Sequence, residues 1–176
     1  MTDKRPIDAI IVEDSQPDRI RMRLLLDALS IHYKFAWNAE INKIIEIDQI
    51  IGMLKKYQPT RLLVDMTWTV EDDRKITKLC FRDKDQIKRM NRNIETDNTK
   101  YIISGFELID ALVDAYNKNE EYMYKLRKLV IVSKYIHPVS YGLKAYIKEL
   151  VDPMYTVSTS FVTKWSEERR FRFIMM

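Results

Sequence analysis

Three carboxylates in this sequence come directly after short apolar runs. Glu13 and Asp14 follow residues 10–12, Ile-Ile-Val, and Asp65 follows residues 62–64, Leu-Leu-Val. Continuous apolar runs of this length are typical of strands buried on both faces of a parallel sheet. Parallel strands bring their carboxyl ends to one edge, where open α/β sheets bind their ligands. We therefore expect the three carboxylates to converge, although Asp65 taken alone could equally cap a turn or helix.

The chemistry of such a cluster follows from its charge. Carboxylates that converge repel one another unless a cation neutralises them, and oxygen-rich sites suit Mg²⁺ or Mn²⁺ rather than zinc. Ser133 ends a further apolar run, and Lys164 follows another candidate strand. Their hydroxyl and ammonium groups could bind a dianionic phosphoryl group on Asp65, whose carboxylate is already a nucleophile and needs no general base. The residue types thus favour metal-assisted phosphoryl transfer to a carboxylate.

An alternation of strands and helices is expected to position these groups. Apolar or aromatic runs predict strands over residues 7–12, 32–37, 62–65 and 129–132, and within 155–162. Helical spacing predicts helices over residues 17–29, 41–56, 106–117 and 137–150, and a short helix at most within 166–176. This rhythm implies right-handed crossovers and a doubly wound, five-stranded parallel α/β sheet within a single domain, 1–176.

Residues 68–103 interrupt the alternation. Charges of both signs crowd this segment, and its apolar residues are sparse. A connection of this length inside a compact domain is uncommon. We interpret it as a mostly helical or loop insertion between the third strand and the third helix. It either offers a partner-binding surface beside Asp65 or restricts phosphate access to it. The alternative is a tolerated surface elaboration.

Composition narrows the class of protein. Apolar residues make up 46% and charged residues 32%, which is typical of a soluble globular chain. No apolar run approaches the ~18 residues of a membrane span, and the N-terminus lacks the apolar core of a secretory signal. The single cysteine, Cys80, cannot form an internal disulfide, which favours a cytoplasmic location. The balance of 30 basic against 26 acidic residues gives no indication of direct nucleic-acid binding.

Five segments, in the right order, resemble a response-regulator receiver domain. Together they extend over nearly the whole chain apart from the insertion, and they are residues 10–19, 62–66, 105–108, 130–133 and 160–164. The resemblance implies a flavodoxin-like fold and a role in two-component or phosphorelay signal transduction.

The resemblance also implies a metal site and a phosphoacceptor. Asp65 would accept the phosphoryl group. Glu13 and Asp14 would hold Mg²⁺ together with Asp65 and the backbone carbonyl of Thr67. Related metal-dependent phosphohydrolases usually have a second acidic residue two positions after the nucleophile, where this chain has Thr67. We therefore expect self-catalysed phosphoryl transfer and dephosphorylation only, and no further enzymatic activity.

The remaining site residues come from the last two strands. By the resemblance, Ser133 would hydrogen-bond the phosphoryl group and Lys164 would pair with it, with Lys134 a rival for that role. Ser133 and Phe161 would be the two switch residues, and Phe161 would be the aromatic one. On phosphorylation, Ser133 would move towards the phosphoryl group and Phe161 would turn inward. These movements would remodel the face formed by the fourth helix, the fifth strand and the C-terminal segment.

The chain departs from the family pattern at several points. The interval from Asp65 to Gly105 is far longer than the family's short loop, and the family's proline soon after the aspartate is absent. Trp165 stands where a proline normally follows Lys164. The interval between Ser133 and Lys164 is also longer than expected.

Two functional hypotheses follow. The first is a stand-alone receiver, because no output domain follows in the sequence, with a histidine kinase or histidine phosphotransfer protein as donor and an effector protein as target. A homodimer is compatible with this hypothesis, and no membrane partner is expected. The alternative is a degenerate, receiver-like binding module that acts without phosphorylation and uses residues 68–103 as its partner surface.

Overall fold

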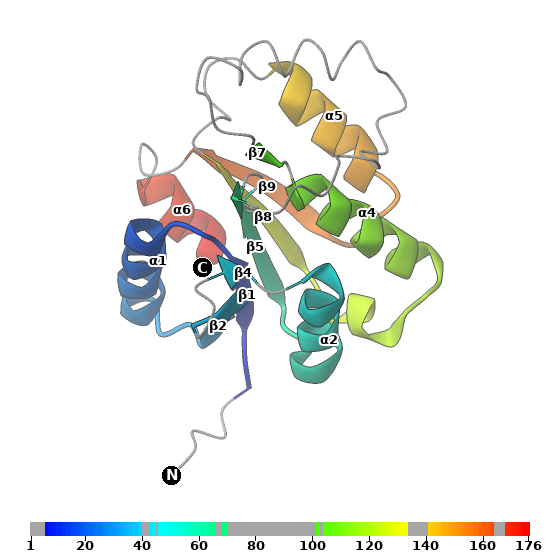
Figure 1. Ribbon diagram of the computed structural model, residues 1–176. Helices are drawn as coiled ribbons and strands as arrows, with labels where there is room; N and C mark the ends of the chain where they lie inside the picture. Colours follow the sequence, from blue (N-terminus) through cyan, green and yellow to red (C-terminus); the bar gives the residue numbers. More distant parts are fainter. Residues whose placement is uncertain are drawn as a thin grey trace.

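A parallel five-stranded sheet forms the centre of the computed structural model, which describes residues 6–39, 43–44, 46–65, 68–69, 101–102, 104–133, 141–163 and 168–176. The strand order is β2-β1-β5-β8-β9, and every neighbouring pair in the sheet is parallel (Figure 1). These strands are β1 (Ala9–Val12), β2 (Tyr33–Phe35), β5 (Arg61–Asp65), β8 (Lys128–Ser133) and β9 (Ser158–Thr163). This order, with the first strand inside the sheet, is that of flavodoxin-like folds. The predicted fold class is confirmed.

The inner strands are apolar on both sides because helices cover both faces of the sheet. Every residue of β1 is buried, and residues 62–65 of β5 are buried as well. Side chains alternate between two cores, with Ile10 and Leu62 in one and Ile11 and Leu63 in the other. A slip of one residue in register would exchange the two sets, so the two cores fix the pairing of β1 with β5.

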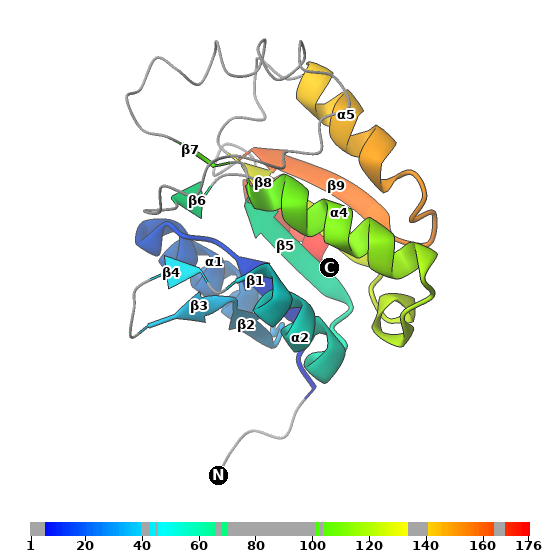
Figure 2. The ribbon, with the colours of Figure 1, turned by 45° about the vertical axis from the view of Figure 1, so that its right-hand side comes forward.

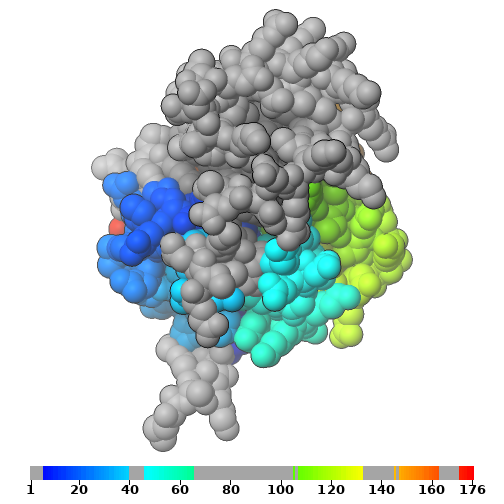
Figure 3. Space-filling model, viewed as in Figure 1, coloured from blue at the N-terminus to red at the C-terminus, as the bar shows by residue number. Residues whose placement is uncertain are grey.

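Three helices pack on one face and two on the other, and Figure 1 shows α2, α4 and α5 separated by the sheet from α1 and α6. Figure 2 brings the first face forward, with α2 and α4 in front of the sheet. The first group comprises α2 (Ile47–Tyr57), α4 (Ser104–Asn117) and α5 (Tyr141–Val151), and a 3₁₀ helix, η1 (Glu121–Tyr124), follows α4. The second group comprises α1 (Gln16–Ala28) and α6 (Glu168–Met175). On the face seen in Figure 3, α1 in blue, α2 in cyan and α4 in green contribute surface atoms. In the described part of the chain, no helix combines the length and the hydrophobicity that a membrane span requires.

The start of α1 follows from its first residues. Ser15 is the N-cap, and its Oγ accepts a hydrogen bond of 3.4 Å from the backbone N–H of Asp18. Pro17 lies in the first turn, where its missing N–H costs nothing. Met22, Leu25 and Leu26 then face the sheet and are buried. The helix therefore begins immediately after Glu13 and Asp14, leaving them in the turn that leads into it.

The region between β2 and α2 differs from the prediction. The second strand was predicted to run to Trp37, but β2 ends at Phe35 and Trp37 begins β3 (Trp37–Asn38). The predicted helical stripe from Ile41 is wrong at residues 43–44, which form β4 (Lys43–Ile44) and pair antiparallel with β3. An isoleucine-rich run fits a strand as well as a helix, and here pairing with β3 decides. Helix α2 begins only at Ile47, where the Gln49 side chain accepts a hydrogen bond from the backbone N–H of Glu46.

The two ends of the segment 68–103 lie side by side. Short strands β6 (Trp68–Thr69) and β7 (Tyr101–Ile102) pair antiparallel, an arrangement that the sequence did not predict. The rest of the expected insertion lies outside the described residues. The chain therefore leaves the main sheet after Asp65 and returns beside its point of departure, immediately before α4.

The C-terminal elements follow the prediction closely. Helix α5 ends at Val151, β9 lies within one residue of the predicted range, and α6 is the short terminal helix. Phe171 and Met175 anchor α6 in the core that it shares with α1. Lys128 Nζ, at the start of β8, donates a hydrogen bond of 2.6 Å to the carbonyl of Ile174. The end of the chain is thus fixed to the middle of the sheet.

Candidate functional site

The candidate site lies where the order in which strands are added to the sheet changes direction. From β1 the chain passes first to β2 on one side and later to β5 on the other, so the topological switch point falls between β1 and β5. Their register pairs Val12 with Val64, and both strands therefore end at the same level. Ligands of open α/β sheets bind outside the carboxyl ends of the strands at this point.

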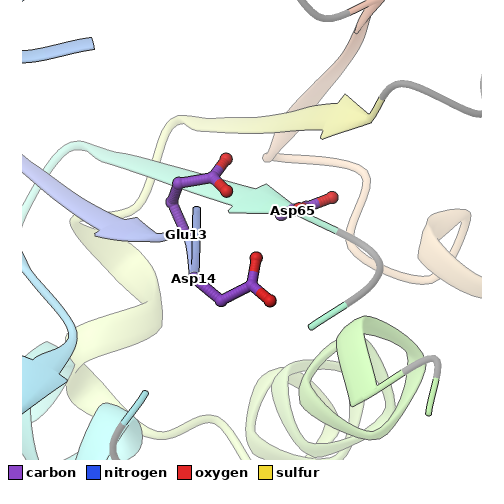
Figure 4. Close-up of side chains that lie close together, drawn as sticks. All are labelled: Glu13, Asp14 and Asp65. Atoms are coloured by element: carbon purple, nitrogen blue, oxygen red, sulfur yellow. The ribbon is translucent and has the colours of Figure 1, made fainter. Parts of the chain in front are cut away.

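Three carboxylates gather there. Each of Glu13, Asp14 and Asp65 places a carboxylate oxygen within 4.8 Å of those of the other two. Figure 4 shows the two side chains that follow β1 beside the one that ends β5. Glu13 and Asp65 are the only charged side chains found buried among the described residues, with 1% and 2% of their surface exposed, and Asp14 is half-buried. Buried charges of one sign this close together are costly unless a cation offsets them, which makes the cluster a candidate cation site.

Backbone groups of the acidic turn help to fix Glu13. The backbone N–H of Ser15 donates a hydrogen bond of 3.0 Å to Oε1 of Glu13. Because the turn runs directly into α1, this bond holds the carboxylate beside the helix start. Carboxylate oxygens are the ligands that Mg²⁺ prefers, so the three residues fit a hard divalent cation. When bound, such an ion would neutralise the cluster and polarise an oxygen of an incoming phosphoryl group.

Arg19 completes the turn, and the sequence did not point to it. Its Nη1 donates hydrogen bonds to the backbone carbonyls of Glu13, at 3.1 Å, and Asp14, at 2.6 Å. Its guanidinium also lies over the ring of Trp37, 3.5 Å from the ring centroid. Burial lowers the pKa of Arg19, while the negative charges of Glu13 and Asp14 act in the opposite direction. The only local signal for the contacts of Arg19 was a basic residue one helical turn after the N-cap, Ser15.

The last two strands, β8 and β9, end at the same edge of the sheet. Asp65 is the register partner of Val132, and Ser133 is the next residue along β8. Ser133 in turn pairs with Thr163, the last residue of β9. Phe161, the predicted switch residue, is buried in the core covered by α2, α4 and α5, with 6% of its surface exposed. Thr67, Lys134 and Lys164 lie outside the described residues.

Fold and site together define a doubly wound, flavodoxin-like α/β protein with a cluster of three carboxylates at its switch point. Comparison with protein-family models and with curated proteins finds no match. Among solved structures, the chain is similar to a response regulator receiver domain protein (CheY-like) from Methanospirillum hungatei JF-1. The two are 8% identical, the alignment covers 95% of this chain and 88% of the other, and the TM-score is 0.47.

Proposed function

We propose that this protein is a phosphorylation-dependent receiver that accepts a phosphoryl group on Asp65 in a Mg²⁺-dependent reaction and signals through partner proteins. The observation that carries the proposal is the convergence of Glu13, Asp14 and Asp65 at the switch point. The receiver-like motifs in the sequence, two of which contain these carboxylates, also support this function, since they fall on β1, β5, α4, β8 and β9 in chain order.

The proposed chemistry divides the carboxylates into two roles. A carboxylate oxygen of Asp65 attacks the phosphorus of a donor such as a phosphohistidine, forming an O–P bond as the P–N bond breaks. The electron pair of the P–N bond goes to the ring nitrogen. The imidazole leaves neutral, either because its other nitrogen already carries a hydrogen or because the freed nitrogen takes a proton from water, and the phosphoryl oxygens retain their charge. Glu13 and Asp14 hold the cation that offsets this charge. Hydrolysis of the resulting acyl phosphate by water resets the site.

Two further residues are proposed to act on the phosphoryl group. Ser133 follows the register partner of Asp65, which makes its hydroxyl a candidate donor to a phosphoryl oxygen. Lys164 directly follows Thr163, the register partner of Ser133, and is proposed to pair with the same group. We propose that a histidine kinase or histidine phosphotransfer protein donates the phosphoryl group. The phosphorylated protein would then act on an effector protein.

Stepwise ligand binding tests the proposal. Mg²⁺ is titrated first by calorimetry, and beryllofluoride, a phosphoryl mimic that bonds to a carboxylate oxygen, is titrated second in saturating Mg²⁺. We expect saturable binding of both ligands by the wild type and loss of beryllofluoride binding in Asp65→Asn. Asp152→Asn, which removes an exposed carboxylate after α5, is the matched control and should bind both.

The outcomes separate the two functional hypotheses. A wild type that binds neither ligand would overturn the proposal and support the receiver-like binding module that acts without phosphorylation. Beryllofluoride binding that persists in Asp65→Asn would show that another residue accepts the phosphoryl mimic. Both results are readable without knowledge of the natural donor.

A further inference from the structure

Arg19 makes two kinds of contact at once, and together they connect the acidic turn to a second part of the molecule. Its Nη1 donates to the carbonyls of Glu13 and Asp14 at 3.1 and 2.6 Å. Its guanidinium carbon lies 3.5 Å from the ring centroid of Trp37. Trp37 opens β3, and its register partner in β4 is Ile44. One side chain therefore spans from the backbone of the candidate metal site to the β3–β4 hairpin.

The chemistry of arginine suits this double contact. A guanidinium is planar, so it donates hydrogen bonds in its plane while an aromatic ring stacks on its face. An ammonium group carries the same charge but has no face to stack, and it is more strongly hydrated. Stacking of a cation on an aromatic ring is favourable, and it strengthens as the pair is desolvated. Trp37 therefore limits the orientations open to Arg19.

The contacts of Arg19 constrain the carboxylates through the backbone. Asp14 and Glu13 are consecutive, and both of their carbonyls accept hydrogen bonds from the same Nη1. The backbone N–H of Ser15, next in the chain, donates to the Glu13 carboxylate at 3.0 Å. If the two carbonyls were released, the peptide planes that carry both side chains could rotate. Groups that orient metal ligands from outside typically change metal affinity by about 10–100-fold when they are removed.

We propose that Arg19 is a positioning residue that sets the geometry of the acidic turn, and that Trp37 holds Arg19 in place, so that the β3–β4 hairpin is coupled to cation binding. The effect on Mg²⁺ rests on the proposed function, whereas the effect on the turn itself does not. A partner that displaces the hairpin would therefore change the affinity of the protein for the cation. By thermodynamic reciprocity, the cation would change the affinity for that partner by the same factor.

Four variants and one control test the proposal in the full chain. Arg19→Met removes charge and donors, Arg19→Lys keeps the charge without the stacking plane, Trp37→Leu removes the ring, and Trp37→Phe restores a ring face. Arg23→Met, on an exposed position of the same helix, is the matched control for loss of charge. Each protein is measured for Mg²⁺ affinity by calorimetry and, without metal, for hydrogen exchange of the Ser15 amide.

We expect Arg19→Met to weaken Mg²⁺ binding about 10-fold and Arg19→Lys to recover little of that loss. Trp37→Leu should weaken binding about 3-fold, and Trp37→Phe should restore most of it. Combining Trp37→Leu with Arg19→Met should cost no more than Arg19→Met alone, because the ring acts through the guanidinium. Arg23→Met should bind as the wild type does, apart from a small long-range charge effect. The Ser15 amide should exchange faster in Arg19→Met and Trp37→Leu.

The outcomes distinguish this proposal from the proposed function. A wild type that binds Mg²⁺ and an Arg19→Met variant that binds it equally well would overturn the positioning role and leave the receiver function standing. Arg19→Met and Trp37→Leu effects that simply add would overturn the role of Trp37. If the wild type binds no Mg²⁺, the proposed receiver function fails. Hydrogen exchange of the Ser15 amide then decides by itself whether Arg19 positions the acidic turn. Unchanged exchange in both variants would then overturn the positioning role as well.

Discussion

Glu13 and Asp65 come from neighbouring strands of the sheet and bring carboxylate oxygens within 4.8 Å of each other, although both side chains are almost completely buried. Two like charges at such a separation repel by about 3.5 kcal/mol at the effective dielectric constant of about 20 that suits protein sites. Asp14 adds a third negative charge to the same cluster. A fold that keeps this arrangement does so at a cost in stability, which is typical of functional sites.

Neutralising one member of the cluster should therefore stabilise the metal-free protein. Asp65→Asn keeps the shape of the side chain and removes its charge. We expect its free energy of unfolding, measured by urea denaturation in EDTA, to rise by about 1–2 kcal/mol. Asp152→Asn, at an exposed position, should stay within about 0.5 kcal/mol of the wild type. A less stable Asp65→Asn would show that favourable contacts of this carboxylate outweigh the repulsion.

A divalent cation should relieve the same repulsion without mutation. Mg²⁺ at about 100 times its dissociation constant should add about 2.7 kcal/mol to the stability of the wild type, which is the gain expected of a ligand that only the folded state binds. Thermal unfolding in MgCl₂, compared with NaCl of equal ionic strength, measures the gain. Asp14→Asn removes one proposed ligand and should lose most of the increase. An equal gain in both salts would indicate charge screening instead of a specific site.

The sequence was sufficient for the sheet and for the convergence of the carboxylates. Residues 10–12 and 62–64 are apolar throughout because both of their faces are covered, and their alternation with helical patterns favours strands of a parallel sheet. Once they are placed in parallel, the side chains that follow them must share an edge. The position of Asp65 beside Glu13 was therefore predictable from local patterns and the rules of α/β topology.

The β3–β4 hairpin and the stacking of Arg19 on Trp37 were not predictable in the same way. Strands of two residues have no periodicity to detect, and Ile44 fits the helical stripe of α2 as well as it fits β4. Arg19 and Trp37 lie on different elements, and only the folded arrangement of α1 and β3 brings them together. No local rule favours one aromatic residue over another as the partner of a helical arginine.

The two-sided burial of β5 leads to a prediction about stability. Leu63 is fully buried in the core shared by α1 and α6, whereas Leu24 of α1 has 62% of its surface exposed. We expect Leu63→Ala to lower the free energy of unfolding by about 2–5 kcal/mol, and Leu24→Ala to change it by less than about 0.5 kcal/mol. Urea unfolding of the two variants is a matched comparison, since both remove the same atoms. Equal losses would contradict the orientation of α1.

A second stability prediction concerns alkaline pH and Tyr122 of η1. This side chain is buried, with 5% of its surface exposed, and burial raises its pKa to about 12, with a smaller contribution from the charge of Glu120. In the unfolded chain a tyrosine titrates near 10. Between these values the unfolded state loses a proton that the folded state keeps, so stability is fully present below pH 10 and falls as the pH rises towards 12.

Tyr122→Phe keeps the ring and removes the proton, and it should therefore lose this part of the pH dependence. Urea unfolding of both proteins at several values between pH 8 and pH 11.5 gives the measurement. We expect the stability of the wild type relative to Tyr122→Phe to decline over the upper part of this range, since only the wild type gains a charge on unfolding at this position. A difference that stays constant with pH would mean that the phenol ionises as readily in the folded protein as in the unfolded chain, and that η1 opens enough at high pH to expose it.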